Sequence, residues 1–377
     1  MMKINRQAKK HDTPNILFIN PWIHDFTAYD FWAKPLGLLT LASILLDHGY
    51  NVSYIDCLDR FHQKAKTTDP SARCGRGPYL KTNIARPKGL EDVTRNFSCY
   101  GIKKEWFIED LESLHRPDLV IVTSLMTYWH PGVKETIDVL RLIFPETPVI
   151  LGGIYATLCR DHAEKTIGAD MVVSGPGAGK ILEIAGNWTG YKVKSRFDPD
   201  NLNTYPYLAL HLEHKISFAP IITSIGCPFS CAYCASRVLN PKLIRRDPLL
   251  TAEEIKYLHE KYNVCDFAFY DDALLVDSEN YAIPMLEKII SSGINVRFHT
   301  PNAIHIREIT DRTARLMKMA GFKTIRIGLE TGDFSLRTKD FDIKVSEKEF
   351  KDAVLSLKNA GFEKNEIGAY QIGRAHV

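Results

Sequence analysis

Three cysteines within eight residues are the part of this 377-residue sequence that points most directly to chemistry. Cys227, Cys231 and Cys234 follow a C-x3-C-x2-C pattern after a short apolar run and a Gly-Cys-Pro turn. Thiolates are soft ligands that suit iron–sulfur clusters and zinc. Three cysteines on a four-iron cluster leave one iron open, whereas structural zinc needs a fourth Cys or His nearby. The next thiol, Cys265, falls in a segment with the pattern of a buried strand, so the cluster is favoured over zinc or a chance spacing.

This pattern, with the aromatic Tyr233 before the last cysteine, resembles the signature loop of the radical S-adenosylmethionine (SAM) enzymes. The resemblance implies a [4Fe–4S] cluster on the three cysteines, with SAM bound to its open iron and Tyr233 near the adenine. It also implies that the reduced cluster cleaves SAM to a 5′-deoxyadenosyl radical. An electron donor such as flavodoxin or ferredoxin is therefore an expected partner.

The segments after the cysteines must form the elements that position them. Residues 266–272, 295–300 and 325–330 alternate between apolar and polar side chains, and helical patterns separate them. Parallel strands whose apolar faces pack on those helices leave their polar side chains on the inner face. This predicts an open barrel with a polar interior, similar to the partial (β/α)6 barrel of radical SAM enzymes. One helix is expected from 252 to 261, entered through a near-fit to a capping box at 251–254.

The resemblance assigns roles to five polar side chains near the ends of these strands. Asp271 and Asp272 occupy the position of the ligands to the SAM amino group, although the usual Gly-Gly-Glu is absent. Glu330 matches the element that contacts the ribose. Arg326 pairs either with the methionyl carboxylate or with a structural acid. His299 is a candidate general acid or base, with a satisfied structural histidine as the alternative.

The N-terminal half has the pattern of a second parallel sheet. Compact apolar runs alternate with helical patterns, and each run has the form of a buried strand. This alternation predicts a doubly wound, Rossmann-like α/β sheet that binds ligands at the carboxyl ends of its strands. The expected strands lie at 15–21, 52–56, 118–124, 148–153 and 171–174.

Small residues occupy two of those strand ends: Thr123 and Ser124 on one, Gly152 and Gly153 on the next. This arrangement resembles the cobalamin-binding domains that precede many radical SAM enzymes, where such strand ends flank the nucleotide tail of the cofactor. The Asp-x-His-x-x-Gly element of other cobalamin proteins is absent, and 174–179 lacks the usual acidic residues. A vestigial sheet that binds no cofactor is therefore the alternative.

The patterns divide the chain into an N-terminal domain at 1–189, a linker at 190–219 and a barrel at 220–377. The insertion at 58–117 is basic, so we expect it to be a solvated face, or alternatively a lid or a site for an anionic substrate. Its isolated thiols, Cys74 and Cys99, are expected to be inert, with ligation of a metal or other group as the alternative. Residues 372–377 match a translated sequencing adapter, so we expect the natural protein to continue beyond an incomplete barrel.

The bulk composition excludes some classes of partner. A net charge of +3 gives no argument for nucleic acid or for an anionic membrane surface. The cysteines cluster, and no signal peptide or long apolar segment is visible, which indicates a reducing cytoplasm. The hydrophobic and charged fractions, 45% and 25%, are ordinary for a globular protein.

Together these features predict a radical SAM enzyme that carries out cobalamin-dependent methyl transfer or rearrangement on an unknown small-molecule or peptide substrate. Two alternatives remain at the level of the sequence. In one, the enzyme binds no cobalamin and the first sheet is a lid or interaction domain. In the other, the protein is a non-catalytic metal-binding scaffold.

Overall fold

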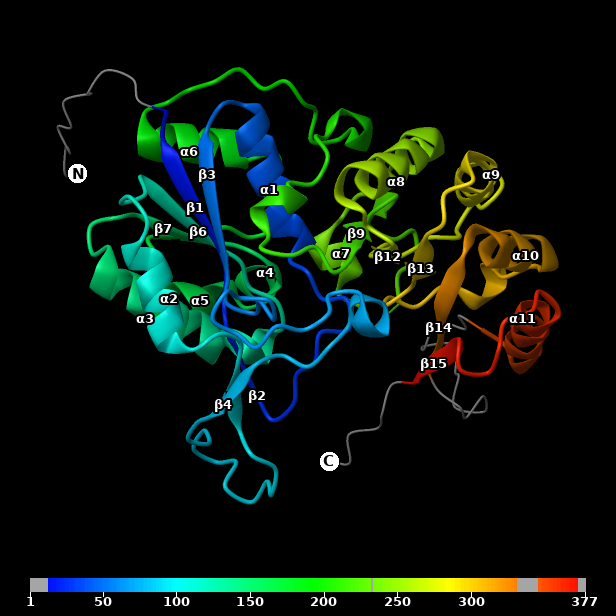
Figure 1. Ribbon diagram of the computed structural model, residues 1–377, viewed down its shortest axis with the longest axis horizontal. Helices are drawn as coiled ribbons and strands as arrows, with labels where there is room; N and C mark the ends of the chain where they lie inside the picture. Colours follow the sequence, from blue (N-terminus) through cyan, green and yellow to red (C-terminus); the bar gives the residue numbers. More distant parts are fainter. Residues whose placement is uncertain (1–12, 232, 331–344, 372–377) are drawn as a thin grey trace.

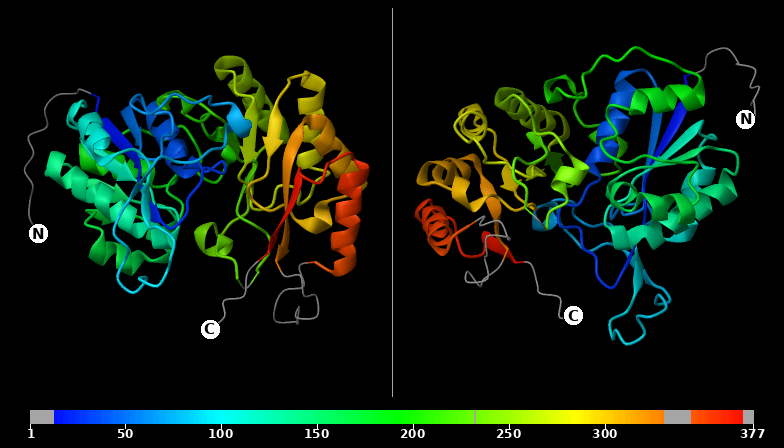
Figure 2. Two further views of the ribbon diagram at one scale, coloured as in Figure 1. Left: turned by 60° about the horizontal axis from the view of Figure 1, so that its bottom comes forward. Right: turned by 180° about the vertical axis from the view of Figure 1, so that it is seen from behind.

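The computed structural model describes residues 13–231, 233–330 and 345–371, and the expected read-through tail at 372–377 lies outside them. Two α/β halves lie side by side in the chain (Figures 1 and 2). Within the described ranges, every helix is too short or too polar to cross a membrane.

The first half is built on five parallel strands, and each falls on a predicted apolar run. In their order across the sheet, the strands are β3 (Asn51–Asp56), β1 (Asn15–Asn20), β6 (Leu119–Val122), β7 (Val149–Leu151) and β8 (Met171–Val172). The chain order reverses between β1 and β6. In sheets of this topology, ligands bind at the carboxyl ends of the strands beside that reversal.

Helices cover both faces of this sheet. On one face lie α1 (Leu36–Asp47) and α6 (Ile181–Thr189). On the other lie α2 (Lys104–Glu112), α3 (His130–Ile143) and α5 (Arg160–Thr166). Successive residues of β1 point to opposite faces, so its apolar side chains enter both cores. This explains why the strand reads as a continuous apolar run rather than an alternating one.

The insertion at 58–117 folds onto the first half through a small antiparallel sheet. Strand β5 (Ser98–Tyr100) pairs with β2 (Ile23–Asp25) on one side and with β4 (Lys81–Asn83) on the other. The side chain of Tyr100 is buried in this region. The insertion is therefore attached to the N-terminal domain by strand pairing, while its basic side chains Lys81, Arg86 and Lys88 are exposed, as expected for a solvated face.

The second half contains another five-stranded parallel sheet, which confirms the predicted fold class of two α/β units in tandem. In their order across the sheet, the strands are β15 (Ile367–Gln371), β14 (Phe322–Glu330), β13 (Arg297–His299), β12 (Asp266–Phe269) and β9 (Ala219–Ile221). Phenylalanines on β12, β13 and β14 fill the core between this sheet and its helices.

Four helices lie along the outer side of the second sheet (Figure 2). They are α8 (Pro248–Tyr262), α9 (Ala282–Ser292), α10 (Asp311–Ala320) and α11 (Glu347–Asn359). The expected start of α8 at 252 was wrong. Asp247 caps the helix by accepting from the N–H of Leu249 at 2.8 Å, and a proline occupies the first helical position.

An aromatic side chain from the first half covers part of the inner face of the second sheet. The Trp32 ring stacks on His299 with ring centroids 4.2 Å apart, and its Nε1 donates to the Cys74 carbonyl at 2.8 Å. The backbone N–H of Lys34 donates to the Tyr270 hydroxyl at 2.8 Å. The alternating pattern predicted a polar inner face, but this long-range contact makes part of it aromatic.

Candidate functional site

The cysteine loop begins where the first barrel strand ends. Strand β9 leads into β10 (Ser224–Ile225), which pairs antiparallel with β11 (Ile244–Arg245), and the loop ends at α7 (Ser236–Leu239). Gly226 has φ +87°, and a Cβ there would lie 2.3 Å from the carbonyl oxygen of Lys242. Because only glycine fits, the Gly-Cys-Pro turn fixes the direction in which the loop leaves the strand.

The three thiols of the loop differ in burial, and the charges of two of them raise the pKa of the third. Cys227 and Cys231 are partly buried and Cys234 is exposed. The N–H of Cys234 donates to the carbonyl of Cys231 at 3.0 Å, which closes a turn. Burial raises the pKa of the Cys227 thiol, and the charges of Asp272 and of the other two thiols act in the same direction. A bound cation would remove this repulsion and favour the thiolates.

The separation of the sulfur atoms distinguishes between the two metal alternatives. Among the described residues, the three sulfurs of the loop do not form a group within 4.8 Å of one another. A single zinc ion holds its sulfur ligands about 3.8 Å apart, given a Zn–S bond of about 2.3 Å and tetrahedral angles. A cluster binds each thiolate to a different iron and so holds the sulfurs farther apart. The loop therefore fits an iron–sulfur cluster better than a single zinc ion.

The carboxyl end of β14 reaches the same loop. Glu330, the last residue of that strand, has φ +64°, which turns the backbone out of the strand direction. Burial raises the pKa of the Tyr233 hydroxyl, and the nearby Glu330 carboxylate and Cys231 thiol add to the effect. The residues expected near the adenine and the ribose of SAM are thus brought together beside the cysteines.

Asp271 is held by the strand that enters the cysteine loop. Its side chain is buried, and Oδ1 accepts from the backbone N–H groups of Thr223 and Ser224 at 3.0 and 2.6 Å. The same oxygen accepts from both hydroxyls at 2.6 and 2.8 Å. Burial raises its pKa to about 6, although these donors favour the charged form. We expected Asp271 to hold the SAM amino group, but the structure engages its carboxylate in positioning the loop.

Asp272 borders the cysteine loop itself. Its carboxylate is partly buried and bonds to the Ser236 side chain, which also lies 3.2 Å from the Cys234 sulfur. Burial raises the pKa of Asp272, and the bond to Ser236 opposes that rise. Of the two adjacent aspartates, Asp272 is therefore the one that remains open to a ligand at the cysteines.

His299 is the last residue of β13 and lies beside Ala268 of β12 and Thr324 of β14. Its Nε2 is 3.0 Å from Oδ1 of Asp266, and its Nδ1 is 3.2 Å from the Thr324 hydroxyl. Arg297 also forms two hydrogen bonds to Asp266. Burial lowers the pKa of His299, against the pull of Asp266. With both ring nitrogens engaged, His299 has the environment of a structural histidine, which was the alternative to an acid–base role.

Arg326 lies on β14 four residues before Glu330, and so deeper in the barrel. Its guanidinium donates to the Ile325 carbonyl at 3.1 Å and lies 5.7 Å from the centroid of the Phe31 ring. Among the described residues, no carboxylate forms an ion pair with it. The structural ion pair that was one expectation for Arg326 is therefore absent from the described part of the chain, which leaves the guanidinium available to an anionic group.

The expected cobalamin-binding residues meet at the carboxyl edge of the first sheet. The Ser124 hydroxyl donates to the Gly152 carbonyl at 2.7 Å and accepts from the Ala156 N–H at 3.2 Å. Gly153 has φ +100°, and a Cβ there would lie 2.2 Å from the Ser124 carbonyl oxygen. A Cβ on Gly152 would meet no atom within 4 Å. Thr123, the residue before Ser124, is largely buried. Ser124 and Gly153 thus shape the edge, while Gly152 leaves open space that fits a bulky ligand.

Two short helices, one from each half of the chain, pack against each other between the carboxyl edges of the two sheets. Helix α4 (Ile154–Leu158) starts directly after Gly153, α7 starts shortly after Cys234, and the two helices are in contact (Figure 1). Each helix follows one of the two predicted cofactor-binding segments. A ligand over Gly152 and a ligand on the cysteine loop would consequently be neighbours.

A separate cavity of about 240 Å³ lies between the first sheet, the insertion and the linker. Asp56, Asp59 and Glu213 are among its lining residues, with Arg60 and His214. Burial raises the pKa of Asp56 to about 7, and the charge of Asp59 contributes. Lys34 and Lys215 also line this cavity, so both signs of charge meet there, and the anionic-substrate role of the insertion stays a prediction.

Sequence reasoning missed several residues that shape the site. Ser236 bonds to Asp272 and contacts the Cys234 sulfur. The Phe229 ring, inside the cysteine loop, packs on His305 with centroids 4.0 Å apart. Only Ser236 could have been predicted from the local sequence, because it follows the last cysteine by two residues. The other pairing joins distant parts of the chain, and no pattern within either segment marks it.

Two family models match this chain. Residues 221–371 match the Radical SAM superfamily, and residues 96–185 match the B12 binding domain. These matches confirm both predicted domain types. They also confirm the cofactor classes that such domains bind, namely a [4Fe–4S] cluster, SAM and cobalamin. Their order along the chain agrees with the two sheets described above.

Curated relatives are similar over parts of their length. An uncharacterized methyltransferase of Pyrococcus horikoshii is 27% identical over 117 residues, covering 31% of this chain and 25% of that protein. Cytidylyl-2-hydroxyethylphosphonate methyltransferase of Streptomyces wedmorensis is 20% identical, covering 84% of this chain and 65% of its own length. The chain thus spans less than two thirds of the length of these curated relatives.

A solved structure supports the fold. The radical SAM methyltransferase TsrM from Kitasatospora setae, with tryptophan and a SAM analogue bound, superposes with a TM-score of 0.66 at 15% identity. The match covers 93% of this chain and 66% of that one. TsrM with cobalamin and a [4Fe–4S] cluster gives a TM-score of 0.65, also at 15% identity, over 96% of this chain and 69% of that one. At this identity the similarity shows that the two proteins share a fold.

Proposed function

We propose that this chain, a member of the radical SAM superfamily with a B12-binding domain before its barrel, is a cobalamin-dependent methyltransferase. The observation that carries the proposal is the contact between α4 and α7, since it brings the open Gly152 edge next to the cysteine loop. Methyl transfer between two bound cofactors requires such proximity. The methyltransferase names of several relatives support the same reaction class.

In this proposal the barrel residues hold and orient SAM at the cluster. Cys227, Cys231 and Cys234 would hold the cluster, and Asp272 would accept a hydrogen bond from the amino group of SAM. Glu330 and Tyr233 contact the nucleoside, because both lie beside the loop. Once bound, the cofactors supply the radical and methyl-transfer chemistry, and the protein positions them and excludes water.

Arg326 has a separate place in the proposal. Its guanidinium lies deeper in the barrel and has no carboxylate partner among the described residues. A guanidinium in that setting favours an anionic or carbonyl-bearing group of SAM or of the substrate. We assign no general acid or base, because His299 is engaged on both nitrogens.

On the first sheet, Thr123, Ser124, Gly152 and Gly153 form a cradle for the nucleotide tail of cobalamin. Ser124 and Gly153 keep the two strand ends in register through the Ser124 hydroxyl and the positive φ of the glycine. Gly152 provides the open space. We place the boundary between the cobalamin and radical domains in the segment 190–219. We also propose that the protein is cytoplasmic and that a flavodoxin or ferredoxin supplies the electron to its cluster.

Anaerobic reconstitution tests the proposal. The chain is loaded with iron and sulfide, then with hydroxocobalamin, desalted, and assayed for iron, sulfide and cobalt. SAM and dithionite are then added and 5′-deoxyadenosine is measured. We expect four irons and one cobalt per chain, with 5′-deoxyadenosine formed.

The outcomes separate the alternatives. Iron and 5′-deoxyadenosine without cobalt would contradict the cobalamin assignment and favour a lid or interaction role for the first sheet. Stoichiometric zinc with no iron would favour a metal-binding scaffold. The Cys265→Ala variant is the matched control for thiol removal, because Cys265 is exposed and precedes β12 outside the loop.

A further inference from the structure

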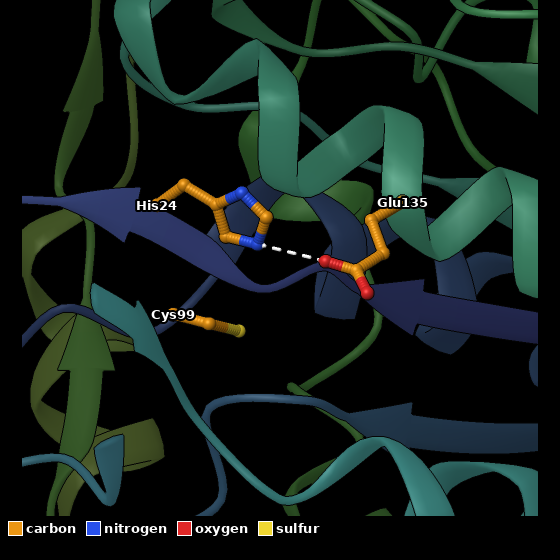
Figure 3. Close-up of side chains that lie close together, drawn as sticks. All are labelled: His24, Cys99 and Glu135. Carbon is orange, nitrogen blue, oxygen red and sulfur yellow. Dashed lines mark ion pairs between the residues drawn. The ribbon is translucent and has the colours of Figure 1, made fainter. Parts of the chain in front are cut away.

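A second group of metal-ligating side chains lies in the N-terminal domain, outside the cysteine loop. It consists of His24 on β2, Cys99 on β5 and Glu135 on α3 (Figure 3). Their ligand atoms all lie within 4.8 Å of one another. Nitrogen, thiolate and carboxylate donors together match the ligand preferences of zinc.

The burial and contacts of the His24 ring are a second observation that favours a ligand site here. Its side chain is 8% exposed, and Nε2 is a buried atom that forms no hydrogen bond among the described residues. Nε2 nevertheless lies 3.1 Å from Oε2 of Glu135. Two ligand atoms on one tetrahedral zinc ion, each about 2.1 Å from the metal, are separated by about 3.4 Å. The pair is therefore close to ligand spacing but not oriented as a hydrogen bond.

The other oxygen of Glu135 is already occupied. Lys104, at the start of α2, lies 3.2 Å from Oε1. This contact fixes the carboxylate so that Oε2 is the oxygen nearest to His24. Outer contacts of this kind orient the ligands of a metal site. The same contact also lowers the pKa of Glu135, after the larger effect of His24, so the carboxylate is charged at neutral pH.

A comparable group elsewhere shows what a non-metal cluster looks like. Cys74, Asp266 and His299 also lie within 4.8 Å of one another. There, Arg297 forms two hydrogen bonds to Asp266, and both nitrogens of His299 have partners. The arginine supplies the positive charge that a metal would bring. That group needs no ion, whereas the buried Nε2 of His24 has an ion-pair contact with Glu135 but forms no hydrogen bond among the described residues.

We propose that His24, Cys99 and Glu135 form a zinc site with water in the fourth position. The three ligands come from the strand after β1, from the insertion at 58–117 and from α3. A zinc ion there joins the small antiparallel sheet to the helical layer of the domain. With water in the fourth position this is an open zinc site rather than a closed structural one, and it does not depend on the chemistry of the cysteine loop.

Metal uptake at this site is coupled to a proton. Burial raises the pKa of the Cys99 thiol to about 12, with Glu135 adding to the rise and Lys104 opposing it. Zinc binds the thiolate, so the S–H bond breaks, the Zn–S bond forms and the proton leaves to solvent.

The test uses the full chain carrying Cys227→Ala, Cys231→Ala and Cys234→Ala, so that the cluster loop cannot bind metal. Cobalt(II) is titrated anaerobically, and its absorption is followed before and after zinc is added. We expect one equivalent of tetrahedral cobalt with a thiolate charge-transfer band, and one equivalent of zinc should displace it. The further substitution Cys99→Ser should weaken binding by at least about 100-fold.

Cys74→Ser in the same background is the matched control, because it alters the other cluster, and it should leave the affinity unchanged. Absence of stoichiometric binding, or equal affinity in the Cys99→Ser variant, would overturn the proposal. If Cys99→Ser does not fold by circular dichroism, Glu135→Gln replaces it. Cobalt affinity that is unchanged by Glu135→Gln would also overturn the proposal.

Discussion

At the carboxyl edge of the barrel sheet, thiols and carboxyl groups gather around Cys231, Asp272 and Glu330. At the same edge of the N-terminal sheet, Ser124 and Gly152 present a hydroxyl, backbone groups and open space. The first edge can ligate a metal and bind charged groups, whereas the second offers shape and hydrogen bonds. In the proposed function, the barrel therefore activates its cofactor, while the first sheet holds a cofactor that brings its own chemistry.

The largest expected effect comes from removing a cluster ligand. Cys231→Ala should reduce 5′-deoxyadenosine formation at least about a thousandfold, because the cluster loses one of three iron ligands. Cobalamin binding, measured by absorbance after desalting, should remain, since it depends on the other edge. A Cys231→Ala protein that cleaves SAM at the rate of the Cys265→Ala control would contradict the roles given to the two edges.

The two glycines of the N-terminal edge should respond differently to alanine. Gly153→Ala should lower the free energy of unfolding by about 3 kcal/mol, because its Cβ meets the Ser124 carbonyl and its φ is +100°. Gly152→Ala should leave stability within about 0.5 kcal/mol, since its Cβ enters open space.

Gly152→Ala should instead weaken cobalamin binding by about tenfold, because the added methyl group occupies space assigned to the ligand. Urea denaturation and cobalamin titration measure the two effects separately. Normal cobalamin affinity in a folded Gly152→Ala protein would show that the cradle lies elsewhere.

The adjacent aspartates of the barrel edge provide a similar pair. Asp271→Asn should destabilise the protein by about 2 kcal/mol and reduce cluster loading, because an amide cannot accept from all the donors of Thr223 and Ser224. Asp272→Asn should keep stability and cluster content but raise the Kd for SAM by about tenfold. Equilibrium dialysis with SAM measures the second effect, and an unchanged Kd would remove Asp272 from the SAM site.

The smallest effect concerns Asp56, a partly buried acid at the end of β3. Its pKa is raised to about 7, above the usual 3.8, so the folded state binds a proton more tightly than the unfolded state. Stability should therefore fall as pH rises from about 4 to about 7. Asp56→Asn should remove this loss and stabilise the protein by about 2 kcal/mol at pH 8 relative to pH 5. Denaturation at the two pH values checks this, and an equal effect at both would contradict it.

Local sequence signals were enough to predict the strands, the cysteine loop and the edge glycines. The apolar runs lie on β1 and β6, and the turn at Gly226 follows from its backbone geometry. Roles that depend on partners far along the chain could not be read in this way. Asp271 and Asp272 are identical residues side by side, and only the contact with Thr223 and Ser224, 47 to 48 positions away, distinguishes them.

The same limit explains two other differences. The inner face of the barrel was predicted from strand alternation alone, and that pattern contains no trace of Trp32, which comes from the other half. The helix start at Pro248 was missed because a weaker capping pattern inside the helix competed with the Asp247 cap. In both cases the local pattern is present in the sequence, but a contact or a cap outside the segment determines the structure.

The most direct test of the account is the magnetic interaction between the two cofactors in one chain. The anaerobic protein is reconstituted with cluster and with cob(II)alamin, reduced, and examined by electron paramagnetic resonance. If the two edges face each other across α4 and α7, the cobalt signal should be split by the reduced cluster, and the splitting should vanish in Cys231→Ala. A fully loaded protein with an unsplit cobalt signal, identical in both variants, would contradict the account.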